Sequence, residues 1–277
     1  MPAIEELWSQ AHEARLTAFV EAAGRSELVG ALHALEGATA QERAQDALLL
    51  QGWAHEVASL AHADAANQAD ALAAVLGERA GFAGATDDYL HPDHSHLHKV
   101  LSTRRGLPIL LSVVWMEVGR RSGIDVAGIG LPGHFIVQVG GRDGPYADPF
   151  AGGRRLSVAE CKERVARSAG GELPWRDEFL RPVPARAILE RVLRNLMTRY
   201  SRSDEPVELY RTLNLLCALT PDQPRPLLQR AAIADRLGAR DRAIADYEQL
   251  TQRFEGTEEG RHAAKWLAEN RVRPLLH

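Results

Sequence analysis

The stretch Leu107–Arg121, LPILLSVVWMEVGRR, decides the fold that the sequence predicts. Apolar residues occupy nearly every side of its helical wheel, which is typical of a helix buried in a protein core. Pro108 suits the first turn of such a helix, and Gly123 suits its end. The strand-like runs that follow are IDVAGIG at 124–130, HFIVQVG at 134–140 and residues 146–150. One buried helix followed by a small antiparallel sheet predicts an α+β core in a mostly helical protein.

The segment before this core, residues 1–86, is rich in Ala, Leu, Glu and Gln, which favours a helical bundle. Helical spacing predicts one apolar face from Leu48, Leu49, Trp53, Val57 and Leu60. Small or polar residues predict helix ends at Ala23–Ser26, at Glu36–Gly37 and at Ala61–His62. Nothing in this segment indicates chemistry, so we interpret it as scaffold.

The segment after the core is helical again and contains a weak repeat of about 34 residues, the period of tetratricopeptide repeats. Leu237–Gly238, Ala243, Tyr247 and Leu250 align with Asp204, Leu209, Leu213 and Leu216. A last helix, EEGRHAAKWLAE from Glu258, would cap the stack. The predicted domains are therefore 1–86, 87–180 and 181–277. The tetratricopeptide-like tail either buttresses the core or offers a groove to a protein partner.

Composition narrows the class of protein. The 277 residues are 45% hydrophobic, and 33 basic against 37 acidic residues give a net charge of −4. This balance argues against nucleic acid as a partner. The sequence has no uninterrupted apolar run long enough for membrane insertion, and its acidic N-terminal stretch is unlike an export signal. With only Cys161 and Cys217, a reducing compartment is expected, and we predict a cytoplasmic location. Oligomeric state is left open.

Three positions occur in the order that a Cys, His, Asp hydrolase requires. Such an enzyme places its nucleophile at a helix start, its histidine on a following strand and its acid on the next strand. Here a helix starts at Pro108, His134 opens a strand, and Asp148 lies in the following strand. This order resembles the core of papain-like and transglutaminase-like enzymes.

The segment more narrowly resembles the SirB-type transglutaminase-like family of bacterial proteins, in which tetratricopeptide-type helices follow the core. The residues that carry the resemblance are Arg104–Ile109, Leu111–Ser112, Glu117, Arg121, Gly123, Gly130–Phe135, Asp148–Phe150 and Gly153. The segment that resembles the family covers about a quarter of the chain. The resemblance places the nucleophile at position 108, where this sequence has proline. It therefore implies a pseudoenzyme that acts in protein–protein interaction or regulation.

An alternative is a hydrolase or acyltransferase with a different nucleophile. Ser112 lies one helical turn after Pro108 on the same face, so it could join His134 and Asp148 as a serine triad. A hydroxyl within a helix can instead bond the carbonyl one turn earlier, and we expect Ser112 to be a small helix-packing residue. Without a nucleophile, His134 and Asp148 are expected to form a structural or ligand-binding polar pair.

The second alternative is a metal. The histidines His91, His94, His96 and His98 lie within eight residues, and three of them could hold Zn. Their spacing matches no standard metal motif. We expect a polar, partly exposed loop that binds no physiological cofactor, although zinc or nickel could bind it during purification.

Overall fold

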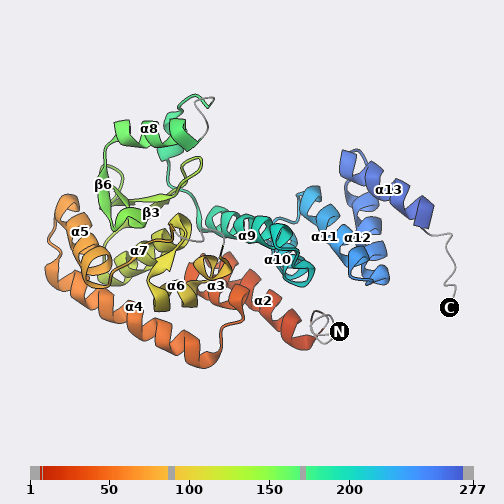
Figure 1. Cartoon of the computed structure of the whole chain (residues 1–277), viewed down its shortest axis with the longest axis horizontal. Coiled ribbons are helices and arrows are strands. Elements are labelled where there is room, and N and C mark those ends of the chain that lie inside the picture. Colours follow the sequence, from red (N-terminus) through yellow and green to blue (C-terminus); the bar gives the residue numbers. More distant parts are fainter. Residues whose placement is uncertain (1–6, 8, 87–90, 169–172, 271–277) are drawn as a thin grey trace. The chain divides into compact units, whose positions relative to one another are not determined.

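The structure is a computed structural model that describes residues 7, 9–86, 91–168 and 173–270. Packing divides the chain into two compact units (Figure 1). We call Ala22–Val192 the core unit and Met1–Glu21 with Leu193–His277 the helical unit. Helices α2 (Gln10–Gly24) and α9 (Ala185–Arg202) contribute residues to both units. The three sequence domains stay a prediction, because packing units and sequence domains are different divisions.

The core unit is built around α7 (Pro108–Ser122). Val113, Val114 and Trp115 are at most 1% exposed, so the helix is buried as the sequence predicts. It packs against α4 (Ala40–Leu60) and the sheet strand β3, between which it lies in Figure 1. The other helices of this unit are α3 (Leu28–Glu36), α5 (Ala65–Leu72), η1 (Ala73–Arg79), η2 (Pro92–Ser95), α6 (Leu97–Thr103), η3 (Pro149–Ala151), α8 (Val158–Ser168) and η4 (Asp177–Leu180).

The sheet is an antiparallel meander in the order β3-β4-β5-β6. Its strands are β3 (Val126–Ile129), β4 (Ile136–Val139), β5 (Tyr146–Asp148) and β6 (Arg154–Leu156). Strand β3 pairs with β4 over Val126↔Val139 to Ile129↔Ile136. The three expected strands are confirmed but shorter, and β6 follows them. Apart from this sheet, β1 (Ala83–Gly84) and β2 (Arg105–Gly106) form a short parallel pair. The predicted α+β, mostly helical fold is confirmed.

The three predicted helix ends of the N-terminal segment are also confirmed. Helix α2 ends at Gly24, α3 ends before Gly37 in a left-handed conformation with φ 69°, and α4 ends before Ala61. The predicted apolar face of α4 is wrong at Leu48, which is 74% exposed. The buried face of α4 includes Leu50, and Leu48 lies about 200° around the helix from Leu50.

The C-terminal helices of the helical unit repeat every 34 residues. They are α10 (Pro206–Leu219), α11 (Pro224–Arg236), α12 (Arg240–Arg253) and α13 (Glu258–Asn270). Helix α12 begins and ends 34 residues after α10, and α13 does so after α11. Even the left-handed residue before α10, Asp204 with φ 56°, has its counterpart in Gly238 with φ 77°. The expected register of the repeat is confirmed.

No helix among the described residues combines the length and the apolar character needed to cross a membrane.

Candidate functional site

The first element of the site is the start of α7. Leu107 precedes the helix in an extended conformation, with φ −70° and ψ 155°, and Pro108 is the first helical residue. Proline fits this position because its φ is already helical and the missing N–H has no partner there. The other end is closed by Gly123 with φ 79°. Both boundaries agree with the sequence prediction.

His134 reaches the site through a tight turn before β4. Its backbone N–H donates to the carbonyl of Leu131 at 3.1 Å. Gly133 in this turn has φ 73°, and a Cβ there would lie 2.5 Å from Cβ of Ser168. A side chain at position 133 would therefore collide with α8, which explains why the turn that positions His134 contains glycine.

Asp148 at the end of β5 holds the imidazole of His134. Nε2 of His134 lies 3.0 Å from Oδ1 of Asp148, and these side chains are 9% and 0% exposed. Oδ1 also accepts the backbone N–H of Phe150 at 3.1 Å, which starts the turn η3. The two residues that the sequence pairs are thus in contact. A fully buried carboxylate needs such partners to offset its desolvation.

Arg164 on α8 adds a cation that the sequence analysis missed. Its Nη1 lies 2.8 Å from Oδ2 of Asp148 and 2.9 Å from Nε2 of His134. Nε2 can donate a hydrogen bond to Asp148 or accept one from Arg164, but it cannot do both at once. The ion pair between Arg164 and Asp148 is compatible with either state. Arg164 therefore neutralises the buried carboxylate and competes with it for the imidazole.

An aromatic side chain covers the imidazole. The rings of Phe150 and His134 meet edge to face, with centroids 5.8 Å apart. Phe150 packs against Gly84 of β1, where a Cβ would lie 2.3 Å from its ring. The short β1–β2 pair therefore supports the cover of the polar pair. His134 and Asp148 thus place a base and an acid where little water reaches them.

The comparison with known families agrees with this geometry. Residues 38–194 match the family described as the transglutaminase-like superfamily, which is more than half of the chain. The chain belongs to the transglutaminase-like superfamily. The matched region runs from α4 through the sheet and into α9.

This transglutaminase-like chain is also similar to curated proteins. A UPF0162 protein of Xylella fastidiosa is 38% identical over 186 residues, which are 66% of either protein. A UPF0162 protein of Vibrio cholerae is 24% identical over 79% of this chain and 85% of its own length. F-box only protein 21 of Homo sapiens is 29% identical over 61% of this chain and 28% of its own length. No solved structure matches the chain.

Neither cysteine of this transglutaminase-like protein has the lowered pKa that an activated nucleophile needs. Cys161 on α8 is fully buried beside Ile129, Leu131 and Ile136, and no hydrogen bond joins it to His134. Burial raises the pKa of the Cys161 thiol, and the nearby Arg164 offsets this only in part. Burial also raises the pKa of Cys217 to about 11. Both thiols stay protonated near neutral pH, whereas a nucleophile needs the thiolate.

Ser112 is fully buried in the interior of α7. Its Oγ has no hydrogen-bond partner among the described residues. The bond that a helical hydroxyl can form to the carbonyl one turn earlier is therefore absent there. No surface of Ser112 is open to solvent, so an approaching substrate would have to displace core side chains.

The four histidines of the predicted loop have different surroundings. Nδ1 of His91 accepts the backbone N–H of Asp93 at 3.3 Å, and the rings of His91 and His94 lie 5.7 Å apart. His96 lines a cavity of about 220 Å³, and His98 turns toward α4. Within the part of the chain that the structure describes, no three His, Cys, Asp or Glu side chains are arranged to hold a metal ion. The expectation that this loop binds no physiological cofactor stays a prediction.

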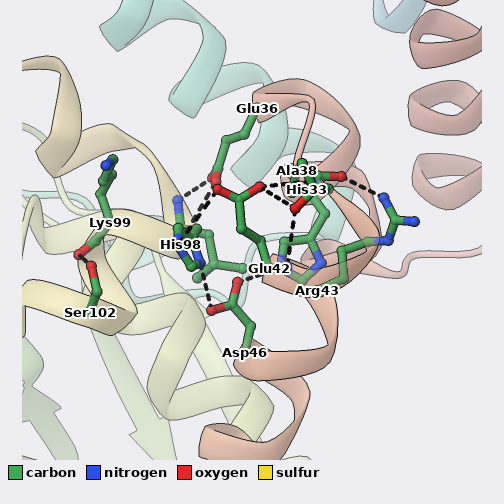
Figure 2. Close-up of polar contacts among 11 residues, drawn as sticks. His33, Glu36, Ala38, Glu42, Arg43, Asp46, His98, Lys99 and Ser102 are labelled. Carbon is green, nitrogen blue, oxygen red and sulfur yellow. Dashed lines mark hydrogen bonds and ion pairs between the residues drawn. The ribbon is translucent and has the colours of Figure 1, made fainter.

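Figure 2 shows a second polar cluster, which sequence reasoning did not find. Asp46 on α4 is 1% exposed and lies between two imidazoles. Its Oδ2 is 2.8 Å from Nε2 of His33, and its Oδ1 is 2.9 Å from Nδ1 of His98. Burial alone would raise the pKa of Asp46, but hydrogen bonds from the two histidines outweigh it and hold that pKa below its usual value. With Nδ1 of His98 bonded to Asp46, Nε2 remains, 3.8 Å from Glu42.

Glu36 closes this cluster at the start of α6. Its two carboxylate oxygens accept the backbone N–H groups of Leu97 and His98. Burial raises the pKa of Glu36 to about 7 in spite of these bonds. His33 and Asp46 are 13 residues apart, and Asp46 and His98 are 52 apart. No spacing rule links such distant positions, so only the folded chain reveals the cluster.

Proposed function

We propose that this chain is a SirB-type transglutaminase-like protein that lacks the catalytic nucleophile and acts in protein–protein interaction or regulation. One observation carries the proposal. Pro108 stands at the helix start where the nucleophile is expected, while His134 and Asp148 keep their contact. Arg164 engages both side chains and occupies the surroundings of Nε2. The polar pair then serves the stability of the core instead of proton transfer.

The helical unit supplies the interaction part of the proposal. Its 34-residue register supports a tetratricopeptide type of repeat, whose stacked helices form extended binding surfaces. In this proposal the protein needs no cofactor, contacts a protein partner rather than nucleic acid, and works in the cytoplasm. Fluorescence microscopy of a tagged full-length chain tests the location.

The test of the catalytic part is a turnover assay. The wild-type protein is incubated with casein, with an acyl ester and with a glutamine-donor peptide, and His134→Ala serves as the matched control. We expect no turnover above the control for any substrate. Robust turnover by the wild-type protein that His134→Ala abolishes would refute the proposal.

One observation favours the alternative, a hydrolase or acyltransferase that uses Ser112. Its buried Oγ has no partner among the described residues, so it is chemically available if the core opens. A fluorophosphonate probe that labels the wild-type protein but not Ser112→Ala would support this function. Metal analysis of the purified protein tests the version with bound zinc. If the protein takes up neither the probe nor a metal, both the serine version and the zinc version of this alternative are excluded.

A further inference from the structure

The helical unit contains an open groove. At the corresponding place in the next repeat, aromatic side chains pack together. The groove has a volume of about 630 Å³ and lies on α9, α10 and α11. Its apolar floor includes Met197, Leu209, Leu213 and Ile233. Helix α9 ends at Arg202, which is 34 residues before the end of α11 at Arg236, so the register of the repeat extends back into α9.

The repeat register shows why this groove is open. Leu213 and Ala232 line it, and 34 residues later the chain has Tyr247 and Trp266. The rings of Tyr247 and Trp266 stack with centroids 4.2 Å apart. Two large aromatic side chains thus pack together in the later repeat, where the earlier repeat has a leucine and an exposed alanine. The open groove has room for one large apolar side chain from another molecule.

The charges around the groove all have one sign. Arg194, Arg202 and Arg225 line it, and no acidic side chain in the described part of the chain does. Arg202 and Arg225 are exposed, and neither side chain has a hydrogen bond or ion pair with any described residue. Arg225 corresponds to Glu259 in the later repeat, so its charge is specific to the open groove. Arg202 corresponds to Arg236, which forms an ion pair with Asp204, whereas Arg202 has no such partner among the described residues. A guanidinium that is not paired within its own chain is well suited to bind a carboxylate.

From this juxtaposition we propose that the groove binds an acidic segment of a partner protein. An aromatic side chain of that segment enters the space that Trp266 fills in the later repeat. Asp or Glu residues on either side of it pair with Arg202 and Arg225. This inference rests on the proposed function, because it names the chemistry of the partner that the helical unit is proposed to bind.

The experiment selects peptides on the immobilised full-length protein from a phage-displayed library of random dodecapeptides. We expect enriched peptides to carry an aromatic residue flanked by acidic residues. Their affinity is then measured by fluorescence anisotropy. Because exposed charge pairs are screened by salt, we expect it to fall as the salt concentration rises from about 0.05 M to about 0.5 M.

Two variants and one control locate the binding. R202E/R225E reverses the two charges and should weaken binding at least about tenfold. R261E/K265E reverses two exposed charges on α13 and should leave affinity within about twofold. Ala232→Trp places in the groove the ring that the later repeat already has, and it should abolish binding without lowering the thermal stability.

Other outcomes overturn the proposal. These are a selection that enriches no peptide, an enriched set without acidic residues, and peptides that bind Ala232→Trp and R202E/R225E as well as the wild-type protein. A concentration-dependent dimer that Ala232→Trp abolishes would assign the groove to a second copy of the chain, which also contradicts the proposal. Turnover in the assay above would refute the lack of catalysis and leave groove binding intact, so the two failures are distinguishable.

Discussion

Two buried aspartates of the core unit each hold histidine, and they differ in the third charged group. Asp148 contacts His134 and also forms an ion pair with Arg164. Asp46 binds two histidines, and a second carboxyl group, that of Glu36, belongs to the same cluster. A guanidinium is permanently charged, whereas imidazole and carboxyl groups can give up their charge. Asp148 and Arg164 therefore form an ion pair of fixed charge, whereas the charge of the cluster around Asp46 and Glu36 depends on pH.

The largest expected effect comes from removing the fixed pair. Asp148→Ala leaves Arg164 without its carboxylate and His134 without its acceptor. Breaking a buried ion pair costs about 3 to 5 kcal/mol in the free energy of unfolding, which urea denaturation measures. Asp148→Asn keeps the size of the side chain and one hydrogen-bond acceptor, so its free energy of unfolding should fall less. A loss below about 1 kcal/mol for Asp148→Ala would show that the pair behaves as a surface ion pair.

The second effect concerns the pH dependence of the Glu36 cluster. The pKa of Glu36 rises from 4.5 to about 7 in the folded state because burial penalises its charge. The folded protein then binds more protons than the unfolded chain between these values, so stability falls as pH rises from 4.5 to 7. The full contribution is about 3 kcal/mol. Denaturation of the wild-type protein and of Glu36→Gln across this window measures it.

Glu36→Gln should remove most of that slope and leave the rest of the pH profile intact. The hydrogen bonds from His33 and His98 lower the pKa of Asp46, which moves its titration away from this window. Identical slopes for the wild-type protein and for Glu36→Gln would contradict the assignment of a raised pKa to Glu36.

A third, smaller effect is expected at the aspartate of the second cluster. Asp46→Ala leaves the buried Nε2 of His33 without an acceptor, which costs about 1 to 3 kcal/mol. The cost should stay below that of Asp148→Ala, because a histidine can adopt its neutral form and an arginine cannot. Chemical denaturation of the two variants at one pH gives the comparison. A larger loss for Asp46→Ala would reverse the ranking of the two clusters.

The smallest effect belongs to Ser112, which is fully buried in the interior of α7. Its Oγ has no partner among the described residues, so Ser112→Ala removes a polar atom and no hydrogen bond. We expect the free energy of unfolding to stay constant or to increase by up to about 1 kcal/mol. A clear loss of stability would reveal a hydrogen bond of Ser112 in solution.

The sequence predicted the elements whose signals are local. The apolar residues of Leu107–Arg121 determine a buried helix wherever the chain places it, and Gly37 ends α3 through its own conformation. The 34-residue register was readable because each repeat contains the same helix pair. Strand β6, by contrast, consists of two arginines and Leu156, so it contains almost no apolar signal for a strand.

The partners of the site were only partly predictable. His134 lies in the turn just before β4, and Asp148 ends the neighbouring strand β5, so their contact follows from the order of the strands. Arg164 lies on an amphipathic helix with many charged residues, and nothing local distinguishes it from the others. The contacts among His33, Asp46 and His98 depend on how α3, α4 and α6 pack, which spacing along the chain does not record.

The central claim is that Pro108 occupies the nucleophile position beside His134. The most direct test is the thiol pKa of Pro108→Cys, obtained from the pH dependence of iodoacetamide labelling at that residue by mass spectrometry. The helix start and the imidazole should hold this pKa well below about 8.5, and His134→Ala in the same chain should raise it. An introduced thiol with a pKa at or above about 8.5, unchanged by His134→Ala, would contradict the account.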